Sequence, residues 1–194
     1  MIFEGTYTVT HMPTHLQMAE ESFHIGPVGL DGLLVESRHL LYGQNIATSR
    51  SSRVWVDANW MPSQIEMEYG FTNLEATVGQ DETTVCVSDG KERKTTNYAV
   101  SRADLFFVLP GTLHAPLFAT RRFCLKGGGT CTFQTLPQGE CYIERRNAVG
   151  GQQRLWAELL LGTHKHTLDI LVSPEGDLLS YTDIDSELFV ELES

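Results

Sequence analysis

The sequence predicts a mainly β protein, a single curled antiparallel sheet that forms an open half-barrel, with one or two short helices as a lid. Three observations lead to this prediction. Apolar residues recur at every second position in several segments, which is the period of a half-buried strand. Turn residues separate these segments at short intervals, and strong helix signals are scarce. The 194 residues suit one domain over positions 1–194, because a single core grows readily to this size.

The first hairpin is predicted over 51–69. The segment SQIEMEY (63–69) alternates apolar and polar residues without interruption, and SSRVWVD (51–57) precedes it. Asn59 and Pro62 in the connection are typical turn residues, so the two segments are expected to pair with each other.

Three further stretches follow the same pattern. ETTVCVSDG (82–90) ends in Asp-Gly, a frequent hairpin turn, and leads into 91–100. GTCTFQTL (129–136) and ECYIERR (140–146) flank a Pro-Gln-Gly turn and predict another hairpin. The segment ELFVELE (187–193) alternates as well, and we consider it as an exposed sheet edge whose glutamates limit aggregation.

Two stretches are helix candidates. The segment 12–22 has Pro13 in the place of a first helical turn. In 101–123, Ser101 and Asp104 resemble a capping box, and Pro110-Gly111 interrupts the apolar run that follows. We therefore expect a short helix there, then a break, then a second short helical or irregular piece.

Charge and hydropathy exclude several classes of protein. The net charge of −11 is dispersed, and no run of Lys and Arg exceeds two residues, which argues against nucleic acid and against an anionic membrane surface. No apolar stretch approaches the roughly 18 residues of a membrane span. The first 15 residues lack the basic and apolar regions of a signal peptide, so a cytoplasmic location is expected, with a periplasmic one as the alternative if a leader has been removed.

The long meander, the hairpin with Val56-Asp57-Ala58 and Pro62, and the segment LFFVLPGTLHAPLF (105–118) together resemble a known family. The layout is similar to the bacterial LolA/LolB-like lipoprotein carriers and to the proposed glycolipid-binding proteins that share their half-barrel shape. This resemblance implies an open β half-barrel whose concave face holds an acyl chain or a similar apolar ligand.

Two histidines stand at the head of the strand predicted in LLLGTHKHTLDILVSPEG (159–176). Because residues at i and i+2 share a face of a strand, His164 and His166 are expected to face the same way as Leu168 and Ile170. The favoured interpretation is a row that lines the mouth of a pocket and grades from polar to apolar.

The alternative is a metal site. PGTLH (110–114) and GTHKH (162–166) resemble cupin motifs, which would make His114, His164 and His166 three ligands of a metal-dependent β-barrel enzyme. The motif order is reversed, however, and the glutamate expected soon after the histidine pair is missing.

Other catalytic chemistry has little support. There is no G-x-S-x-G motif, and KGGGT lacks the ending of a phosphate-binding loop. The four cysteines form no C-x-x-C pair and are expected to be free thiols, several of them buried as small apolar residues. We expect no catalytic residue and no cofactor.

The apolar segment after position 104 supplies most of the predicted lid, with Pro110-Gly111 as its hinge. Three tryptophans, Trp55, Trp60 and Trp156, are candidates for the wall or rim of the pocket. The predicted ligand-binding residues are Trp55, Phe106, Phe107, Leu113, His114, Phe118, Trp156, His164, His166, Leu168 and Ile170.

Three functions follow from these observations. The first is a non-enzymatic binding protein that takes an apolar small molecule or lipid on its concave face. The second is the metal-dependent β-barrel enzyme. The third is a structural domain that binds a partner through a sheet edge. The oligomeric state is not determined by the sequence.

Overall fold

A computed structural model describes residues 3–42, 49–100, 105–107, 115–125, 127, 130–136, 139–149, 151–161 and 163–193 of the chain. For residues 105–107, 115–116, 118–119, 131–136, 139, 147–149 and 161, it describes the backbone alone.

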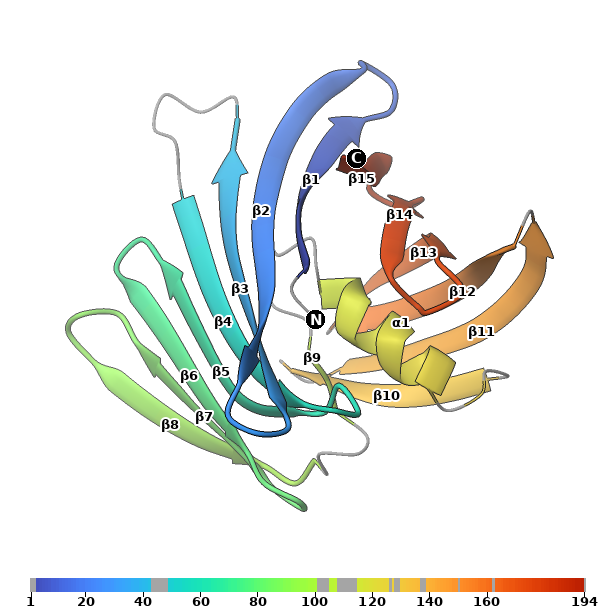
Figure 1. The fold of residues 1–194 in the computed structure, drawn as a ribbon. Coiled ribbons are helices and arrows are strands. Elements are labelled where there is room, and N and C mark those ends of the chain that lie inside the picture. The colour runs from blue at the N-terminus through green and yellow to red at the C-terminus, as the bar shows by residue number, and fades with distance from the viewer. Residues whose placement is uncertain are drawn as a thin grey trace.

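Strands dominate the fold (Figure 1). The first eight are β1 (Phe3–His11), β2 (Leu16–Val28), β3 (Gly32–Leu41), β4 (Ser49–Asp57), β5 (Pro62–Tyr69), β6 (Thr72–Val78), β7 (Thr83–Ser88) and β8 (Arg93–Tyr98). The remaining seven are β9 (Leu105–Phe107), β10 (Thr130–Leu136), β11 (Gly139–Val149), β12 (Gln152–Leu161), β13 (His164–Val172), β14 (Leu178–Asp183) and β15 (Leu188–Glu193).

All these strands belong to one sheet in the order β8-β7-β6-β5-β4-β3-β2-β1-β15-β14-β13-β12-β11-β10-β9. Among the described strand pairs, β9–β10 is parallel and the others are antiparallel. The sheet curls into an open half-barrel, and α1 (Ala115–Leu125) lies on its concave side (Figure 1). The predicted fold class is therefore confirmed, with α1 as the one helix in the described part of the chain.

The predicted hairpins are also confirmed. β4 and β5 pair antiparallel around a turn that the Asp57 carboxylate organises, because its Oδ1 accepts hydrogen bonds from the N–H of Asn59 (2.8 Å) and of Met61 (3.0 Å). Trp60 takes a left-handed backbone conformation in this turn, with φ of 60°. β7–β8 and β10–β11 pair as the alternating segments predicted.

The helix predicted over 12–22 is wrong. β1 ends at His11, a turn follows, and β2 runs on from Leu16 as a strand. Ala19, Glu21 and Phe23 alternate inward along β2, which pairs with β1 on one side and β3 on the other. Backbone pairing on both sides outweighs a single proline signal for a helix start.

The first helix predicted in 101–123 is wrong as well. Residues 101–104, including the capping pair Ser101 and Asp104, lie outside the described residues, and Leu105–Phe107 form strand β9 beside β10. The helical piece comes later, as α1, so the second part of that prediction is confirmed.

The strand predicted at the C-terminus is confirmed, but its place at a sheet edge is wrong. β15 pairs with β1 on one side and with β14 on the other, in the middle of the sheet. The end strands are β8 and β9 instead. Alternation within a strand reveals which residues share a face and says nothing about which strands lie next to it.

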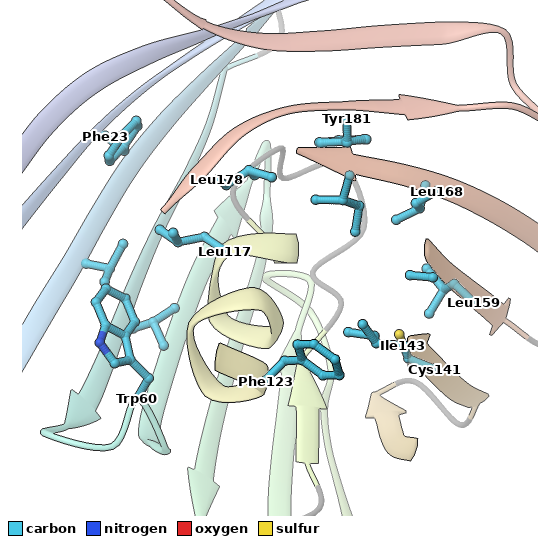
Figure 2. Packing of buried hydrophobic residues seen from close by; sticks show 14 of the residues in the cluster. Phe23, Trp60, Leu117, Phe123, Cys141, Ile143, Leu159, Leu168, Leu178 and Tyr181 are labelled. Carbon is cyan, nitrogen blue, oxygen red and sulfur yellow. The ribbon is translucent and has the colours of Figure 1, made fainter. Parts of the chain in front are cut away.

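The core lies on the concave face, where inward side chains of the sheet meet α1. Leu117 and Phe123 of the helix are both buried. Figure 2 shows both side chains directed from α1 into the buried cluster, Leu117 on the side of Leu178 and Phe123 on the side of Ile143. The helix thus covers apolar surface that the curled sheet leaves open.

Polar contacts fix α1 in place. The Thr120 hydroxyl donates to the carbonyl of Gly176 (3.1 Å), and the Arg121 guanidinium donates to the carbonyl of Glu175 (2.9 Å) and pairs with the Asp177 carboxylate. The same guanidinium lies 5.2 Å from the ring centre of Trp60. Arg121 therefore links the β13–β14 turn to the β4–β5 turn across the concave side.

Tyr7 connects β1 with β2 and with β14. Its ring stacks on Phe23 at 4.9 Å, and its hydroxyl donates to the carbonyl of Leu178 (3.0 Å). Burial, and then the nearby charge of Glu21, raise the pKa of Tyr7. The pKa of the buried Tyr181 is raised for the same two reasons.

Replacement of Leu117 by alanine tests the packing of α1. Because Leu117 is 0% exposed, we expect Leu117→Ala to lower the free energy of unfolding by about 2–4 kcal/mol in urea denaturation. Leu125→Ala in the same helix is the control, since Leu125 is 59% exposed and its loss should cost less than about 0.5 kcal/mol. Equal effects of the two substitutions would mean that α1 does not pack on the sheet.

Alkaline pH tests the burial of the tyrosines. Tyr7 and Tyr181 have raised pKa values in the fold, so above pH 10 the unfolded chain releases protons that the folded protein keeps. The contribution of the two tyrosines to the free energy of unfolding is therefore fully present below pH 10. Above pH 10 the free energy of unfolding should fall by about 1.4 kcal/mol per pH unit for each tyrosine. Urea denaturation between pH 8 and 11 should show a shallower fall for Tyr7→Phe than for the unchanged protein; parallel curves would contradict this.

Candidate functional site

A row of polar and aromatic side chains crosses five neighbouring strands on the concave face. These residues are direct register partners on β1 to β5 and alternate inward with apolar residues of the same strands. We call them the polar row: Tyr7, Glu21, His39, Arg50 and Tyr69.

The polar row runs from the core to the solvent. Tyr7, Glu21 and His39 are buried, Arg50 is half-buried, and Tyr69 is 40% exposed. A ligand that reaches this face from the solvent therefore meets Arg50 and Tyr69 first.

The buried carboxyl group of Glu21 is held by a short hydrogen-bonded chain. The Ser37 hydroxyl donates to Glu21 Oε1 (2.7 Å), and the hydroxyls of Ser37 and Ser52 lie 2.9 Å apart. Burial of a carboxyl group is costly unless it is hydrogen-bonded, so these serines stabilise Glu21 inside the fold. A half-barrel core needs no such group for packing, which makes the cluster a candidate for function.

At the exposed end of the row, Arg50 and Tyr69 form a pair. The Arg50 guanidinium carbon lies 4.2 Å from the centre of the Tyr69 ring, a cation–π contact between β4 and β5. The stacked ring restricts the guanidinium to one face of the sheet.

An apolar strip adjoins this pair on β5 to β7. Its members are register partners and share the inward phase of the buried Ile65, Ala76 and Val85. We define the apolar strip as Met67, Leu74 and Val87. Met67 and Leu74 are half-buried, and Val87 is 38% exposed, so this stretch of the inward face remains in contact with solvent.

A recess of about 150 Å³ opens on the opposite, outward face of the same strands. It is lined by Glu36, Ser37, Ser51, Ser52, Arg53, Glu66, Met67 and Glu68. Of these, Glu36, Ser51, Arg53, Glu66 and Glu68 are in the outward phase of β3, β4 and β5, so the recess is not part of the concave face.

Along β13, the predicted row from His166 to Ile170 faces the concave side, as its alternation indicates. Leu168 and Ile170 are buried in the core, His166 is half-buried, and His164 is exposed. His166 Nδ1 lies 3.0 Å from the Asp183 carboxylate of β14. His166 is therefore held at the rim of the concave face by a neighbouring strand.

Of the three predicted tryptophans, Trp60 is buried in the core, and Trp55 and Trp156 lie on the other face of the sheet. Trp55 alternates with the buried Val54 and Val56, and both it and Trp156 are half-buried. Arg146 stacks on Trp156, with its guanidinium carbon 3.9 Å from the ring centre. The structure thus separates these tryptophans from the inward-facing row of β13.

The predicted lid residues lie largely beyond the described side chains. Leu113 and His114 are outside the described residues. Phe106 and Phe107 are placed by backbone in β9, and Phe118 by backbone in α1. Their role in binding stays a prediction.

The alternative metal site of His114, His164 and His166 also stays a prediction, because it includes His114. Within the described ranges, no three His, Cys, Asp or Glu side chains lie close enough together to hold a metal ion. The Nδ1 of His166 is already engaged with Asp183.

The polar row is not among the residues predicted from the sequence, although a signal for it exists. Glu21 sits in the apolar phase of β2 between Ala19 and Phe23, and Ser37 and His39 continue the phase of Val35 in β3. A charged or polar residue in the inward phase of a strand is the signal that would have found them.

Comparison with solved structures shows that the fold occurs elsewhere. A β-barrel-like protein of the DUF1849 family from Brucella abortus superposes with a TM-score of 0.63, over 98% of this chain and 94% of that one, at 8% sequence identity. A DUF1089 family protein from Pseudomonas aeruginosa gives a TM-score of 0.52, over 84% of this chain and 89% of that one, at 16% identity.

Comparison of the sequence itself gave no relative: no family model and no curated protein matches the chain. Among the described residues, α1 is too short to cross a membrane, and no other helix is available to do so. At such low identity, the two solved structures show a shared β-barrel-like fold and do not assign the chain to the LolA/LolB-like carriers.

Proposed function

We propose that this chain is a non-enzymatic binding protein that holds a lipid-like small molecule on the concave face of its half-barrel. The observation that supports this proposal best is the apolar strip of β5 to β7, which faces inward and yet keeps contact with solvent. Apolar surface on a concave face, with a few polar groups beside it, is the usual character of a small-molecule site.

The position of α1 also supports a binding site on β5 to β7, because the helix covers the other part of the sheet. The helix is hydrogen-bonded to the β13–β14 turn and packs against β9 and β14. The apolar strip lies on β5 to β7, toward the opposite end of the strand order. Apolar surface beside the strip is thus left for a ligand to cover.

The resemblance to lipoprotein carriers of the LolA/LolB type agrees with this proposal, because it implies an open half-barrel that holds an acyl chain. The two solved structures with this fold support the shape alone. The proposal rests on the inward-facing residues of this chain.

Uptake of a fluorescent fatty acid, together with native mass spectrometry of the purified protein, tests the proposal. We expect a bound apolar small molecule after purification or saturable enhancement of the probe fluorescence. A protein that carries no small molecule and takes up no probe would refute the proposed function.

A charge in the apolar strip should abolish uptake. We expect Met67→Glu to weaken binding of the probe at least about tenfold, because an acyl chain cannot lie against an unpaired carboxylate without desolvating it. Gln64→Glu is the matched control. Gln64 is exposed on the same strand in the opposite phase, and its substitution adds the same charge. Thermal denaturation of both variants separates a loss of binding from a loss of fold, and equal probe affinity for the two would place the ligand elsewhere.

A further inference from the structure

We propose that the concave face selects a single-chain amphiphile with an anionic head, which Arg50 binds while the chain lies along Met67, Leu74 and Val87. This inference rests on the proposed function and adds the chemical class of the ligand. It follows from the position of Arg50 at the junction between the polar row and the apolar strip.

The geometry of Arg50 suits an anionic head. Arg50 is half-buried, and its guanidinium carbon lies 4.2 Å from the centre of the Tyr69 ring, which restricts the movement of the guanidinium. A guanidinium has five N–H donors, so it can bind a carboxylate with two parallel hydrogen bonds while the ring of Tyr69 supports its face. Partial burial strengthens such a pair relative to one in water.

The charges around the strip favour an anion, although the whole chain carries −11. Lys94 of β8 is the register partner of Val87 and shares its inward phase. The acidic residues of neighbouring strands, Glu36, Glu66 and Glu75, alternate to the opposite face. The inward Glu21 is two strands away from Arg50 and is hydrogen-bonded to Ser37.

The dimensions fit a chain of medium length. Neighbouring strands lie about 4.8 Å apart, and Arg50 is two residues along β4 from Ser52, the register partner of Met67, so the path from Arg50 to Val87 on β7 spans about 16 Å. An acyl chain that crosses the strands one inward position away from Arg50, at the level of Ser52, would contact Met67, Leu74 and Val87 in turn. Beyond Val87 lies Lys94 of the end strand β8.

Isothermal titration with three ligands of equal chain length tests the inference: decanoate, decanol and decylamine, each below its micellar concentration. We expect decanoate to bind about tenfold more tightly than decanol, and decylamine to bind more weakly than either. This comparison uses the unchanged protein and needs no variant.

Arg50→Gln should weaken decanoate binding about tenfold and leave decanol binding unchanged, because the variant loses the charge-assisted hydrogen bonds to the head alone. Arg53→Gln is the matched control. Arg53 lies on the same strand in the opposite phase and pairs with Glu36 at 3.1 Å. Its substitution by glutamine removes the same charge. We expect it to bind both ligands as the unchanged protein does.

The outcomes separate this inference from the proposed function. Equal affinity for decanoate and decanol, tighter binding of decylamine, or an unchanged decanoate affinity in a folded Arg50→Gln variant would overturn the inference and leave the binding function standing. Failure of the unchanged protein to bind any of the three ligands and the fluorescent fatty acid would overturn both.

Discussion

The contacts of Arg121 hold the two halves of this curled sheet in one arrangement. An open sheet has an apolar concave face that must be covered, and α1 is the element of the described chain that covers it. Arg121 pairs with Asp177 at one turn and stacks on Trp60 at another, so it fixes the helix against both halves. Burial lowers the pKa of Arg121, because a charge held inside the fold is costly, and the ion pair with Asp177 offsets part of that cost.

The position of α1 makes the concave face asymmetric. Leu117 and Phe123 complete a close-packed core against the C-terminal strands, which leaves a ligand little to gain there. On β5 to β7, inward apolar residues remain half-buried beside Arg50 and Tyr69. A fold covered by one short helix thus provides both a stable half and a surface suited to a ligand.

The polar groups that the sequence predicts for the site are on β13, whereas the polar row lies on β1 to β5. His164 and His166 attracted attention because two histidines with one residue between them resemble a metal motif. The polar row attracted none, because its members come from five strands and are separated by up to 62 positions in the chain, from Tyr7 to Tyr69. Only the register between strands shows that Glu21, His39 and Arg50 stand side by side.

The sequence by itself determined the local structure: the strands, the hairpins of β4–β5, β7–β8 and β10–β11, and the inward phase of Leu168 and Ile170. These features depend on alternation and turn residues within a few positions of one another. Tertiary structure decided the rest. The pairing of β15 with β1, the strand in place of a helix at Leu16, and the assembly of the polar row depend on contacts between distant segments, whose energies no local pattern contains.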